Sequence, residues 1–327
     1  MAHPLDPLTA DEITAASTIL KRAQGLADSA RFVSVSLREP AKPAVLAFKA
    51  GDPVDRQAFI VIRERAEKKT YEAVVSISGE KVVSYREVEG VQPSIMLEEF
   101  LTAEEAVKND PRWQEAMRKR GVTDFSLAIL DPWSVGYNGP QDHPSKGRFV
   151  RPLTWLRSGE GEFAYARPVE GLVTLFNLDT NEVVSVDDHG VVPLTDAKAN
   201  YEADRISDPA NFPRFPDGPR QDLKPVEITQ PHGTSFEVDG HRVRWQKWSF
   251  RIGFTPREGL ILYTIAYNDK GRERPVIYRA SIPEMVVPYG DPRFRYWQTY
   301  FDAGEIDELL KREHGVFHRA MSVFRGE

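Results

Sequence analysis

The chain has 327 residues, of which 41% are apolar and 28% are charged, and it contains 22 Gly, 24 Pro and no Cys. This composition is typical of a globular protein, and the lack of Cys excludes disulfides, thiolate metal sites and cysteine nucleophiles. The net charge of -6 gives no basic excess, so we expect no nucleic-acid partner. The length predicts two or three domains, because single cores stop growing near about 250–300 residues.

The start of the chain carries no export or membrane signal. Residues 1–6 have neither the basic region nor the apolar region of a signal peptide. No apolar run approaches the roughly 18 residues that a membrane span needs. We therefore expect a cytoplasmic location and no membrane partner.

The first region predicts one helix followed by an antiparallel sheet. Thr9-Ala-Asp-Glu12 has the spacing of a capping box, and Gly25 is a helix stop. Strand-like runs follow at 32–37, 58–61, 71–77 and 82–88. The last two are joined by Ser78-Gly79-Glu80, which is typical of a hairpin turn.

A second region repeats this order. Thr102-Ala-Glu-Glu105 again places Thr and Glu three residues apart, 93 residues after Thr9, and predicts a helix that runs to Gly121. Strand-like runs follow at 125–130, 149–156, 162–167, 172–178 and 183–186. The repeated order favours a duplicated small α+β domain of roughly 95 residues. Two unrelated α+β units remain the alternative.

The last third of the chain begins with a connector. Six prolines fall within 193–225, which is incompatible with a helix or a central strand. The following pattern is all strand, with Asp239-Gly240 as a hairpin turn, and it predicts the opening strands of a β-sandwich at 236–238, 242–252, 260–267, 275–281 and 285–288. The tail, 304–327, has the spacing of one or two short amphipathic helices.

The residues alone give few catalytic candidates. There is no Gly-rich phosphate loop and no nucleophile elbow, and the seven His include no H-x-H pair. His314 and His318 lie four apart, and a surface or core-edge pair is a better interpretation than a metal enzyme built on them. Asp302 follows the aromatic run 296–301, where a carboxyl of raised pKa would suit a general base. A strand-end turn is the alternative at Asp302.

Several segments together resemble one known family. They are His3–Thr9, Arg257–Tyr263, Tyr267–Asp269, Gly271–Pro275, Tyr278–Ser281, Glu284–Pro292 and Tyr300–Glu305. The pattern, over about residues 3–305, is similar to that of the copper- and topaquinone-containing primary amine oxidases, of the bacterial type that lacks the first domain. The resemblance implies an α+β fold of two small cystatin-like α+β domains followed by the first strands of a large β-sandwich. The implied parts are 1–95, 96–195, a Pro-rich linker 196–225, the start of the sandwich 226–305, and a divergent tail 306–327.

The resemblance also implies roles for particular residues. The family converts primary amines to an aldehyde, hydrogen peroxide and ammonia through a Schiff base with topaquinone. Asp302 matches the base that takes the Cα proton, Tyr289 matches the tyrosine whose hydroxyl hydrogen-bonds the quinone, and Tyr300 matches the gate of the substrate channel. Residues of the smaller domain that fall at the channel mouth are Phe100, Pro132, Trp133 and Tyr165. Ordinary core or surface side chains are the alternative for these four.

The resemblance ends at Glu305, and segment 306–312 does not match. The family's quinone-forming tyrosine, its H-x-H copper pair and its third, distant His have no counterpart in these residues, so Cu²⁺ and topaquinone lack their ligands and precursor here. We therefore expect a truncated or split amine oxidase that is inactive alone, with a primary amine as substrate. A complementary C-terminal half and a second copy in a family-type homodimer are the expected partners. A non-catalytic binding module derived from the family is the alternative.

Overall fold

The structure, a computed structural model, describes residues 3–135, 147–196, 200, 205, 208, 220 and 222–283. The chain divides into two compact units. One combines Met1–Ser94 with Glu227–Val286, and the other combines Ile95–Val226 with Val287–Glu327. No helix among the described residues is long and apolar enough to cross a membrane. The described architecture is α+β with three antiparallel sheets, which confirms the predicted fold class at that level.

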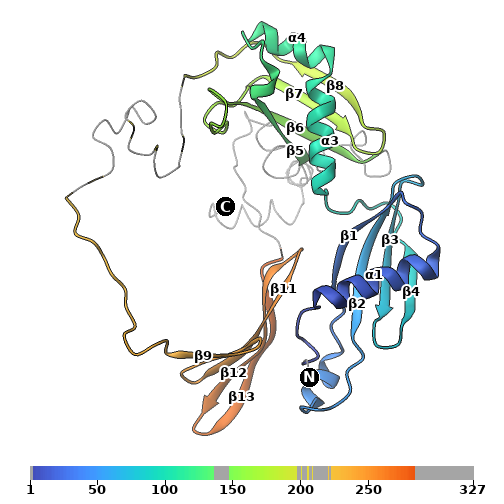
Figure 1. The fold of residues 1–327 in the computed structure, drawn as a ribbon, viewed down its shortest axis with the longest axis vertical. Helices are drawn as coiled ribbons and strands as arrows, with labels where there is room; N and C mark the ends of the chain where they lie inside the picture. The colour runs from blue at the N-terminus through green and yellow to red at the C-terminus, as the bar shows by residue number, and fades with distance from the viewer. Residues whose placement is uncertain are drawn as a thin grey trace, which may run out of the picture. The chain divides into compact units, whose positions relative to one another are not determined.

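The first small domain is a helix packed on a four-stranded sheet (Figure 1). Its elements are α1 (Ala10–Gln24), β1 (Ala30–Leu37), α2 (Lys42–Ala47), β2 (Gln57–Glu64), β3 (Lys69–Ser76) and β4 (Lys81–Glu87). The predicted capping box is confirmed, since the Thr9 hydroxyl accepts from the Glu12 N–H at 3.2 Å and Glu12 accepts from the Thr9 N–H at 2.8 Å. Gly25 ends α1 in the left-handed region, with φ of 59°.

The core of this domain lies between α1 and one face of the sheet. The helix contributes Ala16, Ile19 and Leu20, all buried. The sheet contributes alternate residues of β2 and β3, because side chains of one strand face the same side at every second position. These buried residues are Ala58, Ile60, Ile62, Ala73 and Val75.

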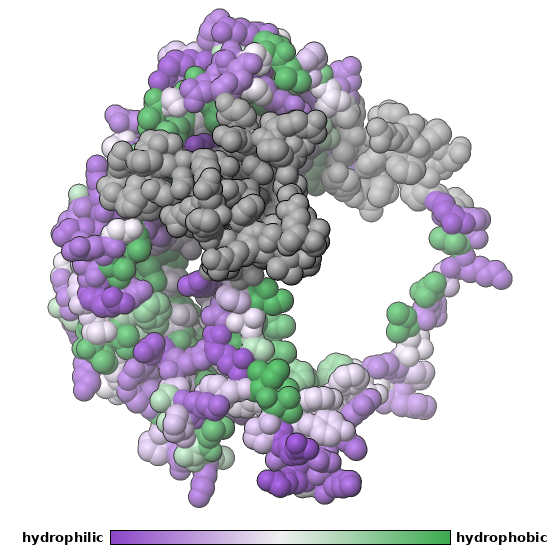
Figure 2. Space-filling view, turned by 180° about the vertical axis from the view of Figure 1, so that it is seen from behind, coloured by the Kyte–Doolittle hydropathy of each residue, from purple (hydrophilic) through white to green (hydrophobic). Residues whose placement is uncertain are grey.

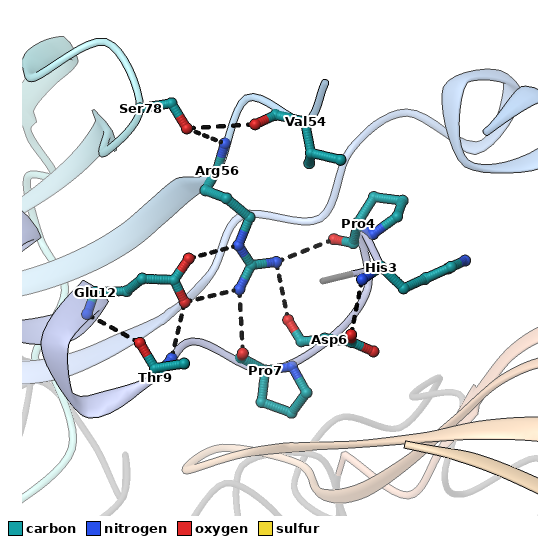
Figure 3. A network of polar contacts seen from close by, with 9 residues as sticks. All are labelled: His3, Pro4, Asp6, Pro7, Thr9, Glu12, Val54, Arg56 and Ser78. Carbon is teal, nitrogen blue, oxygen red and sulfur yellow. Dashed lines mark hydrogen bonds and ion pairs between the residues drawn. The ribbon is translucent and has the colours of Figure 1, made fainter. Parts of the chain in front are cut away.

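Arg56 ties the N-terminal segment to this domain (Figure 3). Its guanidinium donates to Glu12 at 2.7 and 3.0 Å, and to the carbonyl oxygens of Asp6 at 3.0 Å and Pro7 at 3.1 Å. These contacts give the buried guanidinium its hydrogen-bond acceptors. They also hold the segment before α1 against the sheet, and Leu5 in this segment is only 1% exposed. The network is structural: it occupies the donors of Arg56 with protein oxygens.

The same unit contains a five-stranded sheet of order β13-β12-β11-β10-β9. Its strands are β9 (Phe236–Asp239), β10 (Arg242–Trp245), β11 (Trp248–Thr255), β12 (Gly259–Asp269) and β13 (Arg272–Ser281). The prediction of one strand over 242–252 is wrong. Gln246 has a φ of 54°, so the chain turns there and Trp245 pairs with Trp248 across a hairpin. The strand predicted at 285–288 and the helical tail lie outside the described residues.

One side of the five-stranded sheet contacts the segment before α1 and the region of α2. The Arg251 guanidinium pairs with Asp6 at 2.8 Å. Arg279 pairs with Glu39 at 2.9 Å, and the Tyr263 hydroxyl donates to the same carboxylate at 2.7 Å. Beneath these polar contacts lies a small apolar cluster of Leu5, Val45, Ile261 and Tyr263.

The second small domain has the same helix-then-sheet order. Its elements are α3 (Leu97–Lys108), α4 (Pro111–Lys119), the 3-10 turn η1 (Phe125–Leu127), β5 (Ala128–Ser134), β6 (Phe149–Leu156), β7 (Leu172–Asn177) and β8 (Glu182–Asp188). The sheet order is β5-β6-β7-β8, matching the order β1-β2-β3-β4 of the first domain. The helices cover one face, where the Trp113 indole donates to the Thr154 hydroxyl at 3.1 Å inside the core.

Two expectations for this domain are wrong. The helix does not begin at Thr102: α3 begins at Leu97, and the Thr102 hydroxyl donates back to the Glu98 carbonyl at 2.9 Å. A separate helix, α4, begins after Asp110, whose carboxylate caps it and is followed by Pro111. The run 162–167 is no strand either; it forms turns, and Pro168 makes a single bridge to Trp155.

Two buried arginines stabilise the second domain. Arg148 forms a two-pronged ion pair with Glu99 at 2.7 and 2.8 Å, and their side chains are 4% and 3% exposed. Arg120, fully buried, donates to the Asp188 carboxylate at 2.8 Å and to the Gly190 carbonyl at 2.7 Å. The first pair joins α3 to the start of β6, and the second joins the end of α4 to the end of β8.

Candidate functional site

The candidate site lies on the side of β5 and β6 that faces away from the helices. Alternate residues of β5, among them Ala128 and Leu130, belong to the core under α3 and α4. Asp131 and Trp133 therefore point to the opposite side of the sheet. The same alternation on β6 places Trp155, the partner of Ile129 across the strands, on that side as well.

Tyr165 is brought to this surface by the turn segment that follows β6. Its hydroxyl donates to Asp131 Oδ1 in a long hydrogen bond of 3.5 Å. Its ring packs edge-on against Trp155, with ring centroids 5.3 Å apart and planes at 74°. Tyr165 is 52% exposed and Trp133 is 38% exposed, so this carboxyl group lies among aromatic rings that solvent still reaches.

Burial sets the electrostatics of the site. It raises the pKa of Asp131, and the nearby Glu104 carboxylate raises it further, whereas the Tyr165 hydrogen bond lowers it. Burial also raises the pKa of the Tyr165 phenol, and Asp131 adds to that rise. A carboxylate that is poorly solvated gains more from an incoming cation than an exposed one. Beside aromatic faces, the arrangement suits a ligand that carries an ammonium group.

The structure brings together only part of the predicted channel mouth. Trp133 and Tyr165 share the surface with Asp131. Pro132 is buried and faces the other way, toward the helices, opposite Pro152 on β6. Phe100 lies on α3, on the helical side of the domain, and is partly buried. Tyr289, Tyr300 and Asp302 lie outside the described residues, so their roles stay predictions.

Sequence reasoning missed Asp131 and Trp155 as members of this site. A usable signal was present: Asp131 is the single charged residue in the otherwise apolar run from Ala128 to Trp133. Strand alternation would have paired it with Trp133 and separated it from Pro132. Trp155 has no comparable signal, because only the pairing register of β5 with β6 brings it near.

The described residues do not fit a copper site. Among them, no three His, Asp or Glu side chains form a group that could hold a metal ion. His189, His232 and His241 are all exposed, in turns or loops. His314 and His318 lie outside the described part.

Comparison with known protein families gives three matches in chain order. Residues 9–85 match the AGAO-like N2 domain, and residues 98–204 match the copper amine oxidase N3 domain. Residues 237–308 match the copper amine oxidase enzyme domain. The last match begins within β9, so the five-stranded sheet corresponds to part of that domain.

Similar proteins span the same region. A primary amine oxidase of Arthrobacter sp. (strain P1) is 42% identical over 94% of this chain, which covers 45% of that protein. A copper-containing peroxisomal diamine oxidase of Nicotiana tabacum is 36% identical over 96% of this chain and is covered to 44%. The crystal structure of a copper-containing benzylamine oxidase from Hansenula polymorpha aligns with a TM-score of 0.71 at 25% identity, over 89% of this chain and 46% of that one. The chain thus spans about half the length of the relatives it matches.

Proposed function

Because the chain belongs to the copper amine oxidase family, we propose that it forms the N-terminal part of a primary amine oxidase. The overall reaction is RCH2NH2 + O2 + H2O giving RCHO + NH3 + H2O2. The observation that carries the proposal is the 42% identity over 94% of the chain to a primary amine oxidase, together with the enzyme-domain match from residue 237.

The surface around Asp131 is the proposed entry point for substrate. A primary amine is protonated near neutral pH, since alkylammonium groups have pKa values near about 10. The Asp131 carboxylate attracts this ammonium group, and the rings of Tyr165 and Trp155 beside it offer faces to an alkyl or aryl substituent. The site is therefore suited to admit arylalkyl or other apolar primary amines and to orient the amino group.

The chemical step is assigned to residues beyond this surface. Asp302 is the proposed base that accepts the proton from the carbon bearing the nitrogen. Tyr289 is the proposed donor toward the quinone cofactor, and Tyr300 is the proposed gate of the channel. These three assignments rest on the family pattern in residues 284–305.

We propose that the residues that hold copper and form topaquinone lie outside the described part of this chain. The described residues offer no copper site, and the chain spans less than half of each relative described above. We therefore propose that these residues work together with the remaining part of the enzyme domain. That part is supplied either as a continuation of the same polypeptide or as a complementary second chain. Two copies of the completed enzyme then form a homodimer of the family type.

The test is an amine-dependent peroxide assay with and without that remaining part. The 327-residue chain is purified alone, and also after co-expression with the C-terminal part of the Arthrobacter primary amine oxidase that lies beyond the matched region. We expect turnover only from the combined sample, and Asp302→Asn should abolish that turnover while leaving the two polypeptides associated. Peroxide release by the purified chain alone, or unchanged turnover by Asp302→Asn, would contradict the proposal.

The role of Asp131 has its own test in the combined sample. Asp131→Asn should raise KM for a primary amine by about tenfold, the effect of losing roughly 1.4 kcal/mol of binding, with little change in kcat. Asp187→Asn is the matched control, because Asp187 is an exposed carboxylate on β8 of the same domain. An equal change in KM for both variants would remove Asp131 from the entry site.

A further inference from the structure

Tyr165 reaches the candidate site from residues 162–168, which form turns and are here called the turn segment. The end of this segment is joined to β6, because the Leu156 N–H donates to the Arg167 carbonyl at 3.0 Å. Strand β6 therefore fixes where the turn segment ends. The start of the segment is held by another part of the chain.

Asn200 holds the start of the turn segment. The Phe163 N–H donates to Asn200 Oδ1 at 2.8 Å, and Asn200 is only 2% exposed. A buried amide keeps the position in which its polar atoms are hydrogen-bonded, since moving it would leave them unpaired and away from water. Phe163 lies two residues before Tyr165, so this bond fixes the backbone close to the tyrosine that contacts Asp131.

Two further contacts join the same stretches of chain and are more exposed. Arg167 Nε donates to the Thr195 carbonyl at 2.9 Å in an exposed hydrogen bond. Arg205 pairs with Glu162 at 3.5 Å, and the Arg205 side chain is 44% exposed. Exposed ion pairs contribute little, because water and salt screen them. The buried contact at Asn200 is therefore the strongest of these three.

Asn200 lies within the predicted Pro-rich linker, 196–225, and its burial contrasts with the exposure of the stretch that leads to β9. Residues 222–235 are all exposed, and Ile228 among them reaches 95%. Figure 2 shows this stretch at the right as a narrow chain of side chains, with apolar ones among hydrophilic ones. The match to the N3 domain runs far enough along the chain to include Asn200. Asn200 therefore belongs with the second small domain.

The contact between Tyr165 and Asp131 is sensitive to the position of the turn segment. At 3.5 Å their hydrogen bond is at the limit for such bonds, whose usual length is about 2.5–3.0 Å. The Tyr165 ring is 52% exposed and has Trp155 as its edge-on partner, with centroids 5.3 Å apart. A backbone shift of about half an ångström therefore breaks the hydrogen bond and alters the ring contact.

We propose that Asn200 is a positioning residue of the substrate entry site. By accepting from the Phe163 N–H, it fixes the start of the turn segment and holds the hydroxyl and ring of Tyr165 beside Asp131. Asn200 acts through Tyr165 and does not itself contact the incoming amine. This role rests on the proposed function, in which the surface around Asp131 admits the substrate.

The first measurement follows the ring contact in the chain alone, without turnover. The chain is labelled with 5-fluorotryptophan, and the 19F NMR resonance of Trp155 is assigned with Trp155→Phe. Tyr165→Leu, which removes the neighbouring ring, gives the position of this resonance without the contact. We expect Asn200→Ala to move the resonance most of the way to that position, because the start of the turn segment loses its acceptor. An unmoved resonance overturns the positioning role.

Asn177→Ala is the matched control. Asn177 Oδ1 accepts from the backbone N–H of Asp179 at 2.9 Å in the same domain, so the control removes the same kind of hydrogen bond outside the turn segment. It should leave the Trp155 resonance in place, and an equal shift in both variants overturns the positioning role. If Asn200→Ala does not fold, Asn200→Ser replaces it, because the shorter serine keeps a polar group there but does not reach the Phe163 N–H.

The second measurement is amine turnover in the combined sample, with the C-terminal part of the Arthrobacter primary amine oxidase. Asn200→Ala should raise KM for a primary amine by about threefold to tenfold with little change in kcat, as a loss of roughly 0.6–1.4 kcal/mol of binding gives. Because Asn200 acts through Tyr165, Asn200→Ala should add nothing to the KM of Tyr165→Leu. A further rise of KM in the double variant would reveal an effect that bypasses Tyr165 and would overturn the proposal.

The two measurements separate this inference from the proposed function. A Trp155 resonance that depends on Asn200, together with a combined sample that lacks amine turnover, supports the positioning of Tyr165 and contradicts the proposed function. Normal turnover, with the same KM for the wild type and Asn200→Ala, overturns the positioning role and leaves the proposed function intact.

Discussion

The first small domain and the five-stranded sheet use the same alternating antiparallel pattern but bury their apolar faces differently. In the small domain, α1 covers the sheet and leaves Ile60, Ile62 and Val75 fully buried. In the five-stranded sheet, the face that carries Arg251 makes the contacts within the unit, and Trp245 and Phe254 stay 48% and 68% exposed. A sheet can therefore form without both of its faces being buried. The first small domain includes the helix that covers its sheet, whereas one face of the five-stranded sheet has no described helix packed on it.

The largest effect expected from a single change is in the buried ion pair of the second small domain. Arg148→Ala leaves the Glu99 carboxylate, 3% exposed, without its principal cation. Breaking such a pair costs about 3–5 kcal/mol, because an unpaired charge stays in a poorly solvated position. Urea unfolding followed by tryptophan fluorescence measures the loss.

The five-stranded sheet supplies the control for that change. Arg274 pairs with Asp269 at 3.0 Å on β12 and β13, with side chains 65% and 42% exposed. Arg274→Ala should change the free energy of unfolding by no more than about 0.5 kcal/mol. Similar losses for Arg148→Ala and Arg274→Ala would mean that burial does not distinguish the helix-covered domains from the open sheet.

A matched pair of leucine truncations tests the comparison directly. Leu20 of α1 is fully buried, whereas Leu260 of β12 is 57% exposed. Leu20→Ala should lower the free energy of unfolding by about 2–5 kcal/mol, through lost burial and a residual cavity. Leu260→Ala, with the same atoms removed, should cost less than about 1 kcal/mol in the isolated chain.

Leu260→Ala should also affect association with a partner. In the complex with the remaining part of the enzyme domain, Leu260→Ala should weaken association, because its side chain is then buried. If Leu260→Ala destabilises the isolated chain as strongly as Leu20→Ala, the side of the five-stranded sheet that carries Leu260 is covered without any partner.

A smaller effect is expected at the start of α1. Thr9→Ala removes the side chain that accepts from the Glu12 N–H, and it should cost about 0.5–2 kcal/mol. Thr102→Ala is its counterpart in the second small domain, where the hydroxyl lies within α3 and donates to the Glu98 carbonyl. That change should be neutral or stabilising by up to about 0.5 kcal/mol, because Ala is the better helix former. Thermal unfolding of both variants measures the difference, and equal losses would contradict the observed helix starts.

These two threonines show how much of the fold can be predicted from the sequence. Thr9 and Glu12 form a capping box by local spacing alone, and the helix from Ala10 follows from it. Thr102 and Glu105 have the same spacing, but Glu99 and Asp110 accept backbone N–H groups at the actual helix starts. Both alternatives satisfy local rules, so the choice is made by packing, which buries Ala103 and Val107 against the sheet.

The remaining differences also have physical reasons. Gln246 in the hairpin turn has a positive φ although it is not a glycine, so the sequence contains no turn signal at this position. The surface that joins Asp131 to Tyr165 depends on strand register and on a turn segment, neither of which is visible in local patterns. Strand alternation does follow from sequence, and it would have separated Pro132 from Trp133. The roles of Tyr289, Tyr300 and Asp302 stay predictions.

The last expected effect is a pH dependence that arises in the second small domain. The Arg120 guanidinium, with help from the Gly190 N–H and Lys119, lowers the pKa of Asp188 to about 2. An unfolded aspartate titrates near about 3.9, so the folded state binds its proton less readily. The stabilisation is therefore fully present above about pH 5 and is lost as the pH falls through about 4 toward 2.

Asp188→Asn should remove this dependence. The difference in the free energy of unfolding between wild type and Asp188→Asn should be constant from about pH 7 to pH 5 and should vanish near pH 2, as measured by urea titration at each pH. Asp187→Asn, at the neighbouring position, controls for the change in net charge, because the Asp187 carboxylate accepts from Ser185 instead of an arginine. A difference that persists at pH 2 would mean that Asp188 acts through packing. The ion pair with Arg120 would then contribute little to the stability of this domain, which would depend on its apolar core and on the Arg148–Glu99 pair.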